Sequence, residues 1–161
     1  MLPFDYAIPV LIAALLGGVV GFERALRGVS VGLRTHMIIA VSTCLFTLLA
    51  EIMFRRHGGD PTMLAHIISG VGFIGAGAVI HHHERTLGLT SAATIWLVAG
   101  IGMAVGLGEV FMATFVTLIA LFTLHILEPL SDWLTKNGSL ARPKRALAQE
   151  LRQKSRAQRK R

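Results

Sequence analysis

Five apolar runs, each long enough to cross a bilayer, occupy most of this sequence between Tyr6 and Glu128. The hydrocarbon core of a bilayer is about 30 Å thick, and a helix of roughly 17–25 residues crosses it. Lipid offers the backbone no hydrogen-bond partner, so each run is expected to be a helix. The sequence therefore predicts an all-α membrane protein, a bundle of five transmembrane helices with spans at about 6–22, 36–54, 62–80, 89–107 and 110–128.

Basic residues are distributed unevenly between the two sides that five spans define. One side, formed by segments 22–35 and 81–88 and by the C-terminal tail, carries 14 Lys and Arg residues, and the other side carries 2. Short loops rich in Lys and Arg stay in the cytoplasm. We therefore expect a multi-pass protein with its N-terminus outside, its C-terminus in the cytoplasm, and segment 81–88 as a cytoplasmic loop.

Residues 131–161 form a tail that differs in composition from the transmembrane domain at 1–130. The tail has 10 basic and 2 acidic residues and accounts for the formal net charge of +7. Such a composition predicts a largely disordered cytoplasmic tail. Adhesion to anionic lipid headgroups is the functional alternative, at about 1 kcal/mol per basic residue near the surface. No aromatic residue follows Trp133 for base stacking, so nucleic acid is not an expected partner.

Small residues recur at short spacing in the first, third and fourth runs. Lipid provides no hydrophobic drive between helices, so close backbone approach depends on such residues. We expect these three helices to pack tightly, within one chain or in a homo-oligomer. The candidate packing residues are Gly17, Gly21, Gly72, Gly75, Gly77, Gly100, Gly102, Ala104 and Gly106.

Ionisable residues within the runs are few, and each has a structural explanation. Glu51 can pair with Arg55 at the favourable i, i+4 spacing, and Asp60 before Pro61 suits the start of a helix. Asp60, Glu51 and His66 are weak candidates for metal ligands, and the sequence predicts no dedicated metal site and no cofactor. No nucleophile is paired with a base, so no catalytic residues and no enzyme are expected.

The densest polar segment joins the first two runs, from Gly21 to His36. Glu23 and Arg27 can pair at i, i+4. Arg24, Arg27 and Arg34 around one acid leave a net positive pocket at the level of the inner headgroups. Arginine forks suit a lipid phosphate or a partner's carboxylate. An ordinary positively charged loop is the alternative, and the sequence leaves it open.

These residues carry a resemblance to a known family. The chain resembles the MgtC/SapB family of bacterial inner-membrane proteins from about Gly17 to Leu121. The motifs, specific when taken together and in order, are Gly21-Phe22-Glu23-Arg24 with Arg27-Gly28, Gly32-Leu33-Arg34-Thr35, Asp60-Pro61, Ser69 through Gly77, and Gly88-Leu89-Thr90-Ser91-Ala92-Ala93-Thr94-Ile95-Trp96.

The resemblance implies a five-span protein of the bacterial inner membrane that supports adaptation to magnesium limitation and, in some pathogens, survival inside host cells. It implies regulation of other membrane machinery, with the proton-translocating ATP synthase as one partner. The glycine-rich packing faces favour regulation through helix contacts. The alternative is a small oligomeric transporter of magnesium or another ion. The functional candidates are Glu23, Arg24, Arg27, Arg34, Thr35, Asp60, Thr90, Thr94 and Trp96.

The sequence departs from the family pattern in three places. Arginines that the family tends to carry after the Asp-Pro and before the Gly-Leu-Thr are absent at Met63 and Leu87. The tail is also too short and too polar for the folded C-terminal cytoplasmic domain of many members. Any regulation seated in that domain is expected to be missing or supplied by another chain.

Overall fold

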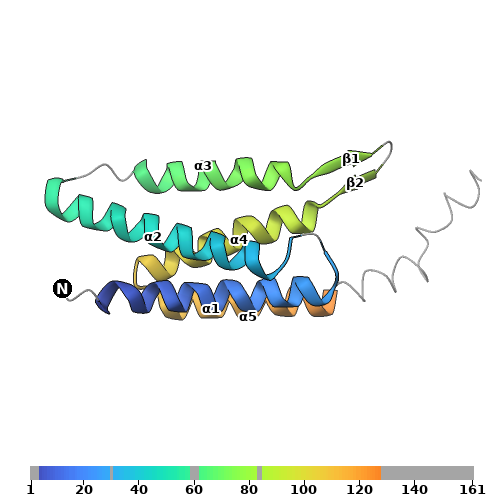
Figure 1. Cartoon of the computed structure of the whole chain (residues 1–161), viewed down its shortest axis with the longest axis horizontal. Helices are drawn as coiled ribbons and strands as arrows, with labels where there is room; N and C mark the ends of the chain where they lie inside the picture. Colours follow the sequence, from blue (N-terminus) through green and yellow to red (C-terminus); the bar gives the residue numbers. More distant parts are fainter. Residues whose placement is uncertain (1–3, 30, 59–61, 83–84, 128–161) are drawn as a thin grey trace, which may run out of the picture. The chain divides into compact units, whose positions relative to one another are not determined.

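The computed structural model describes residues 4–29, 31–58, 62–82 and 85–127 of the chain. The chain divides into two compact units, Met1–Leu121 and Phe122–Arg161. Figure 1 shows helices with one small hairpin between α3 and α4. The elements are α1 (Phe4–Leu26), α2 (Leu33–His57), α3 (Thr62–Gly77), β1 (Ile80–His82), β2 (Arg85–Leu87), α4 (Leu89–Gly106), α5 (Val110–Phe122) and the π-helix η1 (Thr123–Leu127).

Four helical stretches are long and apolar enough to cross a bilayer. They are Tyr6–Leu26, Leu33–Arg56, Leu89–Gly106 and Val110–Leu127. The described part of the chain is otherwise helical except for short connections and the hairpin. The predicted fold class, an all-α membrane protein, is therefore confirmed. The predicted tail at 131–161 and Asp60 lie outside the described residues, and the orientation of the termini stays a prediction.

α1 continues one turn beyond its predicted end at residue 22. Its last turn contains Arg24, a favourable place for a cation because the C-terminal end of a helix carries partial negative charge. Gly28 then adopts a left-handed conformation with φ 68°, which glycine tolerates without steric cost. Its N–H donates to the Ala25 carbonyl at 3.0 Å and ends the helix. Glu23 and Arg24, predicted to lie in a loop, are therefore helical.

The core forms where α2 packs against α1 and α4. Glycine makes this contact possible because the backbones nearly touch. A Cβ added to Gly17 would lie 2.6 Å from the Ala40 Cβ, and one added to Gly102 would lie 2.3 Å from the Ala40 carbonyl oxygen. A Cβ at Gly106 would lie 2.8 Å from the Thr47 Cβ. Fully buried side chains around these contacts include Val20, Cys44, Val98 and Val105.

The other glycines singled out in the sequence lie in looser surroundings. Gly75 of α3 faces Ala92 of α4 at ordinary contact distance, with 3.6 Å from its built Cβ to the Ala92 carbonyl. Positions 72, 77 and 100 have open space where a side chain would project. The tightest interhelical contacts thus centre on Ala40, Thr43 and Thr47 of α2, a helix for which the sequence predicted no packing residue.

α3 is shorter than the predicted span at 62–80. It ends at Gly77 after 16 residues, which is about 24 Å at 1.5 Å per residue. Residues 81–88, expected as a plain loop, instead contribute to an antiparallel pairing in which Ile80 faces Leu87 and His81 faces Thr86. Gly88, the residue between β2 and α4, has φ 86°, and a Cβ there would lie 2.0 Å from the Ala78 carbonyl oxygen.

α5 begins as predicted at Val110, but the expected helix changes type before it ends. The α-helical part stops at Phe122, and Thr123–Leu127 forms a π-helix. Within α5, Ala113, Thr117 and Ala120 are buried. Their spacing of four and three residues places them on one face.

Candidate functional site

An ion cluster occupies the C-terminal turn of α1. Arg27 Nε donates to Glu23 Oε1 across one helical turn. Arg24 Nη1 lies 3.8 Å from Glu23 Oε2, an ion contact too long for a hydrogen bond. The side chains of Arg24 and Glu23 are only 5% and 12% exposed. The cluster therefore holds two cations and one anion in a largely buried place.

Two atoms of this cluster have no hydrogen-bond partner within the described part of the chain. Glu23 Oε2 and Arg24 Nε are both buried and make no hydrogen bond. Buried polar atoms without partners are rare in proteins and are often explained by a water or a ligand. Arg34 and Thr35, the other candidates of this segment, lie exposed in the first turn of α2.

A hydrogen-bonded histidine joins α2 to α4 beside this cluster. His36 is fully buried. Its Nδ1 lies 2.8 Å from the Gly32 carbonyl oxygen, and its Nε2 lies 3.1 Å from Thr94 Oγ1. Thr94 Oγ1 in turn lies 2.9 Å from the Ser91 carbonyl oxygen, to which it can donate. The link connects residues 58 positions apart in the sequence.

The hydrogen-bond acceptors in this link determine which atoms of His36 and Thr94 carry a hydrogen. A carbonyl oxygen only accepts, so His36 Nδ1 carries a hydrogen. In the neutral imidazole, Nε2 is then the acceptor. The single hydroxyl hydrogen of Thr94 is accordingly shared between His36 Nε2 and the Ser91 carbonyl oxygen.

Glycine also positions this histidine. A Cβ added to Gly21 would lie 2.9 Å from the His36 Cβ and 2.8 Å from the Leu33 Cα. The first turn of α2 therefore packs directly on the backbone of α1. This contact explains why the polar segment needs Gly21 as well as its charged residues.

The structure brings together only part of the predicted candidate set. Glu23, Arg24 and Arg27 form the cluster, and Thr94 belongs to the histidine link. Thr90 is exposed, and Trp96 is 57% exposed on another face of α4. His36 and the Ser91 carbonyl also take part in the link, and no pattern in the sequence predicted that Thr94 would connect them.

The weak metal candidates do not converge. Glu51 accepts a hydrogen bond from Arg55 Nε at 2.7 Å, and His66 lies on α3. Among the described residues, no three His, Cys, Asp or Glu side chains gather closely enough to hold a metal ion.

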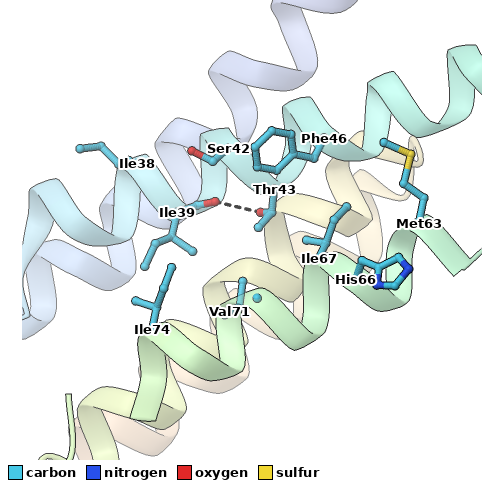
Figure 2. Close-up of a pocket in the computed structure, with 11 residues that line it drawn as sticks. Ile38, Ile39, Ser42, Thr43, Phe46, Met63, His66, Ile67, Val71 and Ile74 are labelled. Carbon is cyan, nitrogen blue, oxygen red and sulfur yellow. Dashed lines mark hydrogen bonds between the residues drawn. The ribbon is translucent and has the colours of Figure 1, made fainter. Parts of the chain in front are cut away.

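A groove of about 490 Å³ separates α2 from α3. Figure 2 shows its mostly apolar walls, with Phe46 on α2 and Ile67 and Ile74 on α3, and the polar side chains of Ser42 and His66 among them. The Thr43 hydroxyl is turned to the Ile39 carbonyl of its own helix, at 2.9 Å. The lining of this groove has no Asp, Glu, Lys or Arg side chain.

We predict that Thr94→Val weakens the junction between α2 and α4. Valine keeps the shape of threonine but removes the hydroxyl, which leaves His36 Nε2 buried without a partner. Interhelical hydrogen bonds in membranes contribute about 0.6 kcal/mol on average and up to about 1.7 kcal/mol. The measurement is the free energy of unfolding in bicelles. Thr90→Val, one turn earlier on α4 and exposed, is the control, and an equal loss in both variants would contradict the prediction.

The helices and the buried polar junction define a multi-pass membrane protein. A family model described as "MgtC family" matches residues 10–133. The chain therefore belongs to the MgtC family.

Curated relatives agree with this assignment. The chain is 35% identical over 134 residues to "Putative magnesium transporter YhiD" of Escherichia coli K12, which covers 79% of this chain and 62% of that protein. It is 39% identical over 121 residues to "Protein MgtC" of Salmonella typhimurium LT2, covering 75% and 52%. An uncharacterized protein of Haemophilus influenzae is 39% identical over 145 residues, covering 84% and 60%.

The chain thus spans about half to three fifths of the length of these relatives. Their names are those of a transporter, an uncharacterized protein and MgtC, and none is the name of an enzyme. No solved structure matches the chain.

Proposed function

We propose that this protein supports adaptation to magnesium limitation by regulating other membrane machinery through helix contacts, and that it has no catalytic role. The proposal places it in the bacterial inner membrane, with the N-terminus outside and the C-terminus in the cytoplasm. The proton-translocating ATP synthase, implied by the family resemblance, is the first partner to test.

The proposal rests on the hydrogen bonds that the buried polar groups make. Thr43, Thr47 and Thr117 each donate to a carbonyl of their own helix, at 2.8–2.9 Å. His36 and Thr94 bond to each other. A transporter is expected to present polar groups to its substrate near the midplane. Here the buried groups stabilise helices and their contacts instead. The groove between α2 and α3 is lined mostly by apolar side chains, with Ser42, Thr43 and His66 as its polar residues.

The alternative is a small oligomeric transporter of magnesium or another ion. One observation favours it: Glu51 borders two cavities, of about 210 and 250 Å³, near the C-terminal end of α2. The Escherichia coli relative is named a putative magnesium transporter, which also favours this alternative. A carboxylate between two cavities is a reasonable entry for a cation.

The test combines a flux measurement with a growth measurement. Vesicles containing only the purified protein are expected to show no magnesium flux above empty vesicles. In cells limited for magnesium, Gly72→Leu is expected to abolish the growth advantage while the variant still folds and inserts, because position 72 has open space and a leucine there would block a partner helix. Gly100→Leu, equally open but on α4, is the matched control.

Two outcomes contradict the regulator proposal. Magnesium flux in the native protein that Glu51→Gln abolishes would establish the transporter alternative, and Glu51 is exposed enough for that substitution to leave folding intact. Normal growth with Gly72→Leu would remove the helix contact on which the regulator proposal depends.

A further inference from the structure

One exposed face of α3 alternates a bulky side chain with empty space. His66, Gly70, Phe73 and Gly77 are spaced i, i+4, i+7 and i+11, so they share a face of the helix. All four are exposed, and Phe73 is 83% exposed. A Cβ at Gly70 or Gly77 would meet nothing within 4 Å. Phe73 therefore projects as a knob between two holes.

This face opens onto the groove between α2 and α3. His66 and Gly70 belong to the face and also line the groove, opposite Ser42 and Phe46 of α2. In Figure 2 the side chain of Ser42 lies on α2 and that of His66 on α3. Neither the Ser42 hydroxyl nor the His66 imidazole has a hydrogen-bond partner within the described ranges. Ser42 lies well inside a helix that is long and apolar enough to cross a bilayer, where hydrocarbon cannot supply a partner.

Two copies inserted in the same orientation are related by a two-fold axis along the membrane normal. Their α3 helices then run parallel, and residues at equal depth meet. Each residue of a helix is rotated by about 100° from the one before it. In a view along the membrane normal, the Phe73 side chain therefore projects to one side of the line that joins the two α3 helices. The two-fold axis places the partner's groove on that same side. Phe73 also lies at the depth of Gly70 and Ile74, which line the groove. The same surface therefore supplies both the projecting side chain of Phe73 and the space that receives it.

We propose that this face of α3, with the adjoining groove, is the contact between two copies of the chain. Phe73 of each copy sits over Gly70 of the other at the mouth of the groove, in a knobs-into-holes contact. A lipid acyl chain could fill the same space, but it would leave Ser42 and His66 without any polar neighbour. A second copy brings its own Ser42, His66 and Ser69 to the contact. This proposal does not depend on the regulator proposal.

Cysteine cross-linking in native membranes tests the contact. In a background in which the buried Cys44 is replaced by alanine, Gly70→Cys is expected to give an oxidised band at twice the mass of the chain. Ile68→Cys is the matched control, because Ile68 is 43% exposed on another face of α3 at nearly the same depth. The Gly70→Cys variant has room for the new side chain, so folding is not in question.

A second measurement concerns the knob. Phe73→Ala is expected to lower the association constant of two copies at least tenfold, measured by counting fluorophore bleaching steps in vesicles. Phe111→Ala on α5, where the side chain is 86% exposed, is expected to leave it unchanged. Monomers at all densities, a link from Gly70→Cys to a different protein, or equal cross-linking from Ile68→Cys would each overturn the proposal.

Discussion

Replacing Gly102 by leucine is expected to be the most damaging single substitution in the transmembrane core. A Cβ at this position would lie 2.2 Å from Thr43 Oγ1 and 2.3 Å from the Ala40 carbonyl oxygen. The second of these atoms is backbone and cannot rotate away. Overpacking of a core costs about 1–3 kcal/mol even where side chains can yield. We therefore expect a loss of more than about 3 kcal/mol in unfolding free energy for a substitution that must separate α2 from α4.

The measurement is reversible unfolding in bicelles, with the yield of folded protein as a second readout. Gly100→Leu is the matched control, because it lies on the same helix two residues away and has open space around it. We expect the control to unfold like the native protein. A native-like Gly102→Leu would mean that the close contact between α2 and α4 does not exist in the membrane.

Removing the carboxylate of Glu23 is expected to have the second-largest effect. Glu23→Ala leaves Arg24 and Arg27 without their common anion, and Arg24 is 4% exposed. Breaking a buried ion pair by deleting one partner typically costs about 3–5 kcal/mol, because the remaining charge is uncompensated. The free energy of unfolding is therefore expected to fall by about 3 kcal/mol.

Glu51→Ala provides the comparison, since Glu51 and Arg55 form the same i, i+4 ion pair in an exposed place. Exposed ion pairs contribute about 0–1 kcal/mol. Measured side by side, the two alanine variants separate burial from the pairing geometry itself. Equal losses of stability would show that the cluster at Glu23 is open to water, contrary to its burial in the structure.

The sequence predicted the helices well because lipid imposes a length and an apolar composition on each span. It predicted their ends less well. The charged residues Glu23 and Arg24 read as loop, but a cation in the last turn suits the helix. Residues 78–80 were apolar enough to extend α3, yet the helix ends at Gly77 and Ile80 pairs with Leu87 in the hairpin. Pairing across a turn competes with helix there, and composition alone does not reveal it.

The candidate site also contains residues that the sequence predicted and residues that it did not. Glu23 and Arg27 were accessible to sequence reasoning because their pairing is local, one turn apart. His36 was not, because its partner Thr94 lies 58 residues away. Its local signal was a lone histidine at the start of an apolar run. Glycine spacing likewise predicted close packing without naming α2 as the partner, because the face that a helix turns inward is decided by its neighbours.

The shortness of α3 has a consequence for the bilayer around it. As a membrane span, its length of about 24 Å would leave about 6 Å of a 30 Å hydrocarbon layer unmatched. Lipids beside such a helix must compress, or flanking residues must reach toward the headgroups, at a fraction of a kcal/mol for each ångström. Hydrophobic mismatch of this kind favours thin membranes and draws helices with short spans together. The length of α3 thus gives this protein a preference for its lipid surroundings that no single side chain specifies.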